Sequence, residues 1–209
     1  YRGDTTDFSA ILAKIKDYQP DVIYLPDYTN IVNLVTAQAK TMGVTIPFVG
    51  GDGWDGSALD LSAASGGYFI NHFAWDAPRP EVSAFYSAFS GAYGYAPNTV
   101  AALAYDAAQL IFQAMGEAGT TDPALVKTNL ASISHTGATG RLYYEPQHNP
   151  LKTAWVMSVS ALNGVRYFSA IDPEKPPATL AINYPNGSPG STFILTGTYF
   201  PAGGTATVT

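Results

Sequence analysis

Asp52 is the first candidate for chemistry in this sequence, because it is a single carboxylate between glycines directly after a short apolar run. Residues 48–54 read Phe-Val-Gly-Gly-Asp-Gly-Trp, and the run before Asp52 is typical of a buried strand. A carboxylate in that place can accept hydrogen bonds. Gly51 has no side chain, so the backbone there can approach a ligand closely. The segment therefore predicts a strand end that faces a ligand.

A second strand end of this kind lies upstream, at Tyr28. Residues 22–25 (Val-Ile-Tyr-Leu) stop at Pro-Asp-Tyr, and a helical pattern follows. Small ligands bind outside the carboxyl ends of strands in open parallel α/β sheets. Neighbouring strands lie about 4.8 Å apart, so Tyr28 and Asp52 can reach one small molecule if their strands pair. Taken alone, Gly-Asp-Gly is more often a turn than a site, and Tyr28 is typical of a helix start or a surface.

The composition narrows the function classes. The chain has 209 residues, of which 46% are hydrophobic and 12% charged, and its net charge is −6. It can bury a core, and its acidity argues against nucleic acid as a partner. The absence of cysteine excludes disulfides, thiol nucleophiles and cysteine-bound zinc. No apolar run approaches the roughly 20 residues that span a bilayer, so no direct membrane insertion is expected. The chain starts at Tyr1 without an initiator methionine, so we expect this not to be the natural N-terminus.

The elements that must hold Tyr28 and Asp52 follow an alternating pattern. Helices and strands in alternation predict an α/β fold with a parallel sheet flanked by helices. The predicted order is helix 8–15, strand 22–25, helix 29–41, strand 48–49, a short helical piece 57–64 and strand 67–70. The helix over 29–41 is expected to bury Ile31, Leu34, Val35 and Ala39, which share one face.

The later part of the chain is first helical and then β-rich. A helix is predicted from Pro80 to about residue 91, an alanine-rich buried helix over 98–115, and a helix from the cap Asp122 to residue 130. Strands are predicted at 142–144, 153–159 and 165–168, and Asn163-Gly164 is typical of a hairpin turn. Prolines make 173–178 a linker, and 179–209 are typical of the start of an incomplete, Ig-like β-sandwich module.

Several spaced motifs of this chain occur together in one known family. They are DFSA (7–10), PDVIY (20–24), QAK (38–40), Gly43, GGDGW (50–54), AALAYDA (101–107) and GATG (137–140). Their order and spacing resemble the leucine/isoleucine/valine-binding proteins, which are type I periplasmic substrate-binding proteins of branched-chain amino-acid ABC transporters. The resemblance covers about residues 1–170 and only the later part of that family's domain.

The resemblance implies two α/β lobes that are joined by a multi-strand hinge and close on a ligand. Within a ligand-binding domain over 1–172, residues 1–72 and 151–170 would belong to the second lobe and 73–150 to part of the first. The hinge crossings would lie near 72–75 and near Pro150. The main sheet of the first lobe, which holds the ligand's α-carboxylate in this family, would precede Tyr1. The periplasmic-binding-protein fold is therefore expected to be incomplete in this chain.

The resemblance also implies roles for individual residues. Asp52 matches the acidic residue that pairs with the ligand's α-ammonium, and Tyr28 matches an aromatic residue of the same pocket. Val100 falls where many relatives have an aromatic contact to the ligand side chain, so the pocket here is expected to differ in shape. Trp54, like Tyr24, is interpreted either as a wall of the cleft or as a core residue.

The resulting expectation is a non-enzymatic, extracellular, periplasmic or cell-surface-anchored bacterial receptor without a cofactor. Its ligand would be a branched-chain or other small amino acid, and its partner a membrane permease of an ABC transporter. A ligand-sensing extracellular domain of a receptor or surface protein is the alternative, favoured by the proline-rich linker and the β segment.

An enzyme and a metal protein are the remaining classes. A carboxylate pair of Asp52 with Asp27 or Asp55 could hydrolyse a substrate, but no sequence feature fixes the required separation. Asp52, Asp55 and Asp60 lack the ligand spacing of a calcium loop. The three histidines, His72, His135 and His148, have no metal-ligand spacing and are expected in loops or the hinge.

Overall fold

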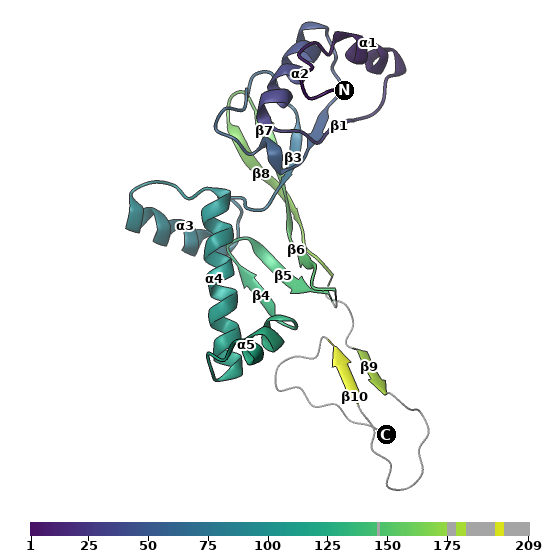
Figure 1. The fold of residues 1–209 in the computed structure, drawn as a ribbon. Helices are drawn as coiled ribbons and strands as arrows, with labels where there is room; N and C mark the ends of the chain where they lie inside the picture. Colours follow the sequence, from purple (N-terminus) through teal and green to yellow (C-terminus); the bar gives the residue numbers. More distant parts are fainter. Residues whose placement is uncertain (146, 175–178, 183–194, 199–209) are drawn as a thin grey trace.

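The elements from α1 to β8 form two bodies (Figure 1). The computed structural model describes residues 1–145, 147–174, 179–182 and 195–198. One body, here called the sheet body, contains residues 1–71 and 154–171 with a five-stranded sheet. The other, the helical body, contains residues 80–152 with three helices and a three-stranded sheet. The chain crosses between them at 72–79 and at Thr153.

The sheet of the sheet body is parallel in its first half and antiparallel in its second. The strand order is β1-β2-β3-β7-β8, in which β1, β2 and β3 run parallel. β7 pairs antiparallel with β3 and forms a hairpin with β8, as the Asn163-Gly164 pair predicts. The elements are α1 (Ser9–Tyr18), β1 (Ile23–Leu25), α2 (Thr29–Thr41), β2 (Phe48–Gly50), the 3₁₀ helix η1 (Asp52–Trp54), β3 (Tyr68–Asn71), β7 (Ala154–Ser160) and β8 (Gly164–Ile171). The α/β prediction is confirmed, although the sheet is mixed and not wholly parallel.

Trp54 connects the three parallel strands from inside the core. Its indole is fully buried, and its Nε1 donates a hydrogen bond of 3.0 Å to the carbonyl of Leu25, at the end of β1. The ring also fills the space where Gly50, at the end of β2, has no side chain. A Cβ there would lie 2.1 Å from Nε1. On β3, the Phe69 ring lies 6.1 Å away between centroids. The position of η1 is therefore fixed relative to all three strand ends.

Two sequence predictions for the sheet body are wrong. Residues 57–64 form turns and no helix. Helix α2 buries Val32, Val35, Thr36 and Ala39, whereas Leu34 is exposed. Thr36 can be buried because its hydroxyl donates to the carbonyl of Val32 at 2.8 Å, which satisfies its polar group within the helix.

The helical body has three helices, and two of them begin at a capping side chain. It contains α3 (Pro80–Tyr93), α4 (Thr99–Ala118), α5 (Pro123–Leu130), β4 (Ser134–Gly137), β5 (Gly140–Tyr144) and β6 (Pro150–Lys152). Asn98 caps α4, and Asp122 caps α5 as predicted.

The prediction that the alanine-rich helix is buried is wrong for part of its surface: α4 buries one face, while Ile111 and Phe112 are 43% and 64% exposed. Strands β4 and β6 were not predicted, because both are short and pair with β5 across loops.

A charged cluster lies where the chain crosses between the bodies. Arg79 binds both carboxylate oxygens of Asp172, at 3.0 and 3.1 Å. The hydroxyl of Thr153 donates to the same carboxylate at 2.7 Å. The Arg79 guanidinium also lies 4.8 Å from the ring centre of Trp155. These contacts join three chain segments at the junction, and the pKa of Asp172 is lowered, chiefly by the Arg79 hydrogen bonds.

Lys152 forms a second connection at the junction. Its Nζ donates to the carbonyls of Thr139 and His72, at 2.7 and 3.3 Å. Burial lowers the pKa of Lys152 to about 8, and the nearby carboxylate of Asp106 acts in the opposite direction. Asp106 is itself buried and accepts from the backbone amides of Ala138 and Thr139. The two chain crossings are thus connected by charged side chains that have hydrogen-bond partners.

The predicted β module is described only at two strands. β9 (Thr179–Ile182) and β10 (Leu195–Thr198) pair antiparallel. The rest of this segment, and residues 175–178 of the predicted linker, lie outside the described residues.

Gly50→Ala tests the packing of Trp54. We expect it to lower the free energy of unfolding by at least about 2 kcal/mol, because the new methyl group overlaps the indole. Gly51→Ala is the matched control, since a Cβ there meets nothing within 4 Å and the backbone φ is −99°. Chemical denaturation of both variants measures the difference. Equal stability of the two variants would contradict this packing.

Asp172→Asn tests the junction. The lowered pKa means that the charged carboxylate stabilises the folded state above its unfolded pKa of about 4, and that this contribution disappears as the pH falls through the folded value. We expect the variant to lose about 1–2 kcal/mol at pH 7 and progressively less in acid. Denaturation at several pH values, with the exposed Asp21→Asn as control, measures this. A loss that is independent of pH would argue against the ion pair.

Candidate functional site

The carboxyl ends of β1, β2 and β3 lie side by side, and a polar or aromatic residue follows each strand. Leu25 pairs with Gly50 and Gly50 with Phe69, so the three ends are aligned. Tyr28, Asp52 and His72 follow these ends in the chain. The first two strands pair, which is the condition that the sequence analysis set for Tyr28 and Asp52 to reach one ligand. The candidate site is therefore the edge of the sheet at which three loops meet.

The loops after β1 and β2 are in direct contact. The hydroxyl of Thr29 donates to the carbonyl of Gly53 at 3.0 Å. A Cβ at Gly53 would lie 2.6 Å from the carbonyl oxygen of Asp27, so only glycine permits this approach. The loop that carries Asp52 is thus packed against the loop that carries Tyr28.

Asp52 and His72 form an exposed pair at the centre of this edge. Asp52 Oδ2 lies 3.3 Å from His72 Nε2, and their side chains are 65% and 47% exposed. Asn71 orients the start of the His72 loop, because its Oδ1 accepts from the His72 amide at 2.8 Å. Sequence reasoning placed His72 in the hinge and missed its contact with Asp52. Its position directly after the third strand was the signal that could have found it.

Tyr28 presents its ring to solvent from the neighbouring loop. It occupies the N-cap position of α2 with an extended backbone, and its side chain is 76% exposed. Its amide donates to Asp27 Oδ1 at 2.7 Å, so the Asp27 carboxylate is engaged within its own loop. An exposed carboxylate and an exposed aromatic ring on two loops that pack together are an arrangement that suits a cationic group.

Val100 reaches the same region from the helical body. The hydroxyl of Thr99 donates to Asp55 Oδ2 at 2.5 Å, and Asn71 Nδ2 donates to Thr99 at 3.3 Å. These bonds place the first turn of α4, which includes Val100, beside the Asp52 loop. The Val100 side chain is 71% exposed. The first turn of α4 therefore adds an apolar surface from the second body.

Trp54 does not share this exposed position. Its indole is fully buried beneath the loop, so of the two interpretations left open by the sequence the core role fits and a cleft wall does not. Tyr24 is 68% exposed, on β1. Trp54 therefore packs in the core under the Asp52 loop and does not line the site.

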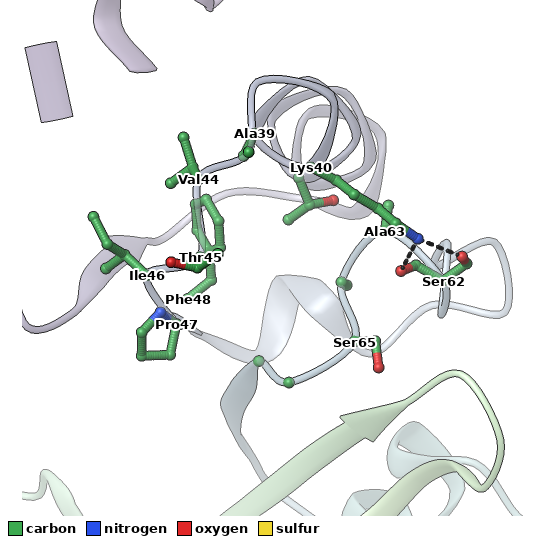
Figure 2. Close-up of a pocket in the computed structure, with 15 residues that line it drawn as sticks. Ala39, Lys40, Val44, Thr45, Ile46, Pro47, Phe48, Ser62, Ala63 and Ser65 are labelled. Atoms are coloured by element: carbon green, nitrogen blue, oxygen red, sulfur yellow. Dashed lines mark hydrogen bonds between the residues drawn. The ribbon is translucent and has the colours of Figure 1, made fainter. Parts of the chain in front are cut away.

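One cavity formed by the described residues adjoins the site, and another lies away from it. A cavity of about 330 Å³ between the bodies is lined by residues that include Asp55, Asn71 and Thr99. Another of about 360 Å³ lies at the opposite edge, by the amino ends of β2 and β3 (Figure 2). There Lys40 Nζ donates to the carbonyl and the hydroxyl of Ser62, at 3.1 and 2.9 Å. Its place at the amino ends separates it from the candidate site.

The described residues offer little for metal or acid–base chemistry. Within the described ranges, no three His, Cys, Asp or Glu side chains come together as a metal site. Asp27 and Asp55, the predicted partners of Asp52 in a carboxylate pair, accept hydrogen bonds from Tyr28 and Thr99. No helix in the described part of the chain has the length and apolarity to cross a membrane.

Comparison with known proteins identifies relatives of this chain. The curated Leu/Ile/Val-binding protein homolog 1 of Brucella suis is 28% identical over 155 residues, which are 72% of this chain and 41% of that protein. A leucine binding protein of Thermotoga maritima is 27% identical with a TM-score of 0.68, over 83% of this chain and 51% of that one. The branched-chain amino-acid transporter substrate binding protein of Streptococcus pneumoniae, solved with isoleucine, is 32% identical with a TM-score of 0.65, over 80% and 50% of the two chains.

The comparisons indicate the fold of this chain and how much of that fold the chain contains. The chain spans 41% of the curated relative and about half of each solved structure. The periplasmic binding protein family matches residues 1–164, which is more than half of the sequence. Strand order, helices and family match all indicate a type I periplasmic-binding-protein fold that is present in part. The chain therefore belongs to the periplasmic binding protein family.

Proposed function

We propose that this chain is part of an extracellular substrate-binding protein that binds a branched-chain or other small amino acid. The observation that carries the proposal is the exposed Asp52 carboxylate at the end of β2, on a loop packed against the loop that carries the exposed Tyr28 ring. The names of the relatives support it, since they include leucine-binding and branched-chain amino-acid transporter proteins. The sheet body would be most of the second lobe, and the helical body part of the first.

In this proposal Asp52 pairs with the α-ammonium of the ligand. An ammonium that leaves water needs a charge partner, or its desolvation is too costly. A carboxylate that is solvated in the open protein loses water when the bodies close, and its attraction to the ligand then increases because the local dielectric constant falls. Tyr28 would cover one side of the ligand, and the open space at Gly51 would let it approach the backbone.

Val100 would contact the side chain of the ligand. It is exposed at the first turn of α4, and the bond of Thr99 to Asp55 brings that turn to the Asp52 loop. Valine is smaller than an aromatic residue, so it leaves more room for an aliphatic side chain than a ring would. Closure would then shift toward the bound form by as much as the ligand's affinity differs between the two states. The closed form would deliver the ligand to a membrane permease.

A ligand-sensing surface protein is the second candidate. The antiparallel pair β9–β10, which follows the sheet body in the chain, favours it. Uptake of labelled leucine in cells with and without the gene separates the two functions. A loss of uptake supports transport, and unchanged uptake with a lost response to leucine supports sensing.

Asp52→Asn tests the ammonium role. We expect the variant of the full-length protein to bind L-leucine, L-isoleucine or L-valine at least about 30-fold more weakly than the wild type, because a closed site would leave the ligand charge unpaired. Asp17→Asn, an exposed residue of α1, makes the same charge change away from the site. Isothermal titration calorimetry measures the three proteins. Unchanged affinity in Asp52→Asn would contradict the role of Asp52.

A further inference from the structure

His72 completes the row of residues at the strand ends. β3 ends at Asn71, so His72 stands in the same relation to β3 as the Asp52 loop does to β2. Its Nε2 lies 3.3 Å from Asp52 Oδ2, which is the oxygen that would meet a ligand ammonium. The pair is thus built from two adjacent strand ends.

The contact has a chemical consequence because imidazole carries a charge only when it is protonated. A neutral imidazole can donate one ordinary hydrogen bond to a carboxylate, whereas an imidazolium forms a charge-assisted one. An imidazolium at Asp52 also repels a second cation that approaches the same oxygen. A protonated His72 would therefore compete with an ammonium ligand for Asp52, and a neutral His72 would compete much less.

Other charged groups around His72 do not take over its contact with Asp52. Asp55, on the same loop as Asp52, accepts from Thr99. Lys152 contacts the backbone of His72, because its Nζ donates to the His72 carbonyl at 3.3 Å. The carboxylate of Asp106 interacts with Lys152. Because burial lowers the pKa of Lys152 to about 8, Lys152 stays mostly protonated at pH 7 and below. The contact that protonation of His72 would change at this edge is therefore the one with Asp52, at 3.3 Å.

We propose that His72 is a specificity-determining residue of the ligand site, which in its protonated form occupies Asp52 and weakens the binding of amino acids in acid. The inference rests on the proposed function, because it requires Asp52 to receive the ligand's ammonium. It adds a dependence on pH and a second residue that sets how strongly the site favours cations.

The test is calorimetric titration of the full-length protein with L-leucine at about pH 5.5 and about pH 7. We expect the wild type to bind about two- to fivefold more weakly at the lower pH, which is the range for competition by an exposed ion pair. His72→Gln keeps a hydrogen-bond donor without the titrating charge, so its affinities at the two pH values should be equal. His148→Asn removes an exposed histidine of the helical body, and it should keep the wild-type ratio.

The outcomes separate this inference from the proposed function. Equal wild-type affinities at both pH values, or a pH ratio that persists in His72→Gln, would overturn the role of His72 while leaving amino-acid binding intact. Absence of binding to L-leucine, L-isoleucine and L-valine at both pH values would overturn the proposed function and this inference together. A wild-type ratio that disappears in His72→Gln and persists in His148→Asn supports it.

Discussion

The burial of one indole, that of Trp54, determines where the candidate site lies. The ring fits only because Gly50 has no side chain, and its N–H is satisfied by the carbonyl of Leu25. A buried donor without a partner would destabilise the fold, so the bond and the packing together fix η1 against β1 and β2. Asp52 begins η1 and therefore has a defined position, although its own side chain is exposed. A binding residue on a loop that a rigid core supports is well placed to recognise a small ligand.

The charged groups at the junction between the bodies are bonded within the protein, unlike the exposed Asp52. Arg79 and Asp172 satisfy each other, and Lys152 binds two backbone carbonyls, so these groups contribute to the connection of chain segments. At the strand ends, in contrast, the Asp52 carboxylate has one exposed partner and is open to solvent. A receptor that closes on a ligand needs both kinds of charged group. Its junction must persist in the open and the closed state, while its site exchanges solvent for ligand.

Local signals in the sequence were sufficient for much of the fold. The caps Asn98 and Asp122, the Asn163-Gly164 turn and the alternation of elements act over a few residues, and the structure agrees with them. The errors arose where contacts between distant residues decide the outcome. Thr36 is buried because its hydroxyl is satisfied within the helix, and α4 is exposed on one face of its apolar sequence. The contact of His72 with Asp52 joins residues 20 apart and follows only from the pairing of β2 with β3. The predicted roles of Tyr28, Asp52, Gly51 and Val100 in ligand binding remain predictions.

A crystal structure of the full-length protein with L-leucine or L-isoleucine tests the central claim most directly, because it locates the ligand's ammonium. We expect this group within hydrogen-bond distance, about 2.7–3.2 Å, of the Asp52 carboxylate, with the Tyr28 ring against the ligand and Trp54 still buried beneath the loop. An amino acid bound away from the carboxyl ends of β1, β2 and β3, with Asp52 still paired to His72, would contradict the claim.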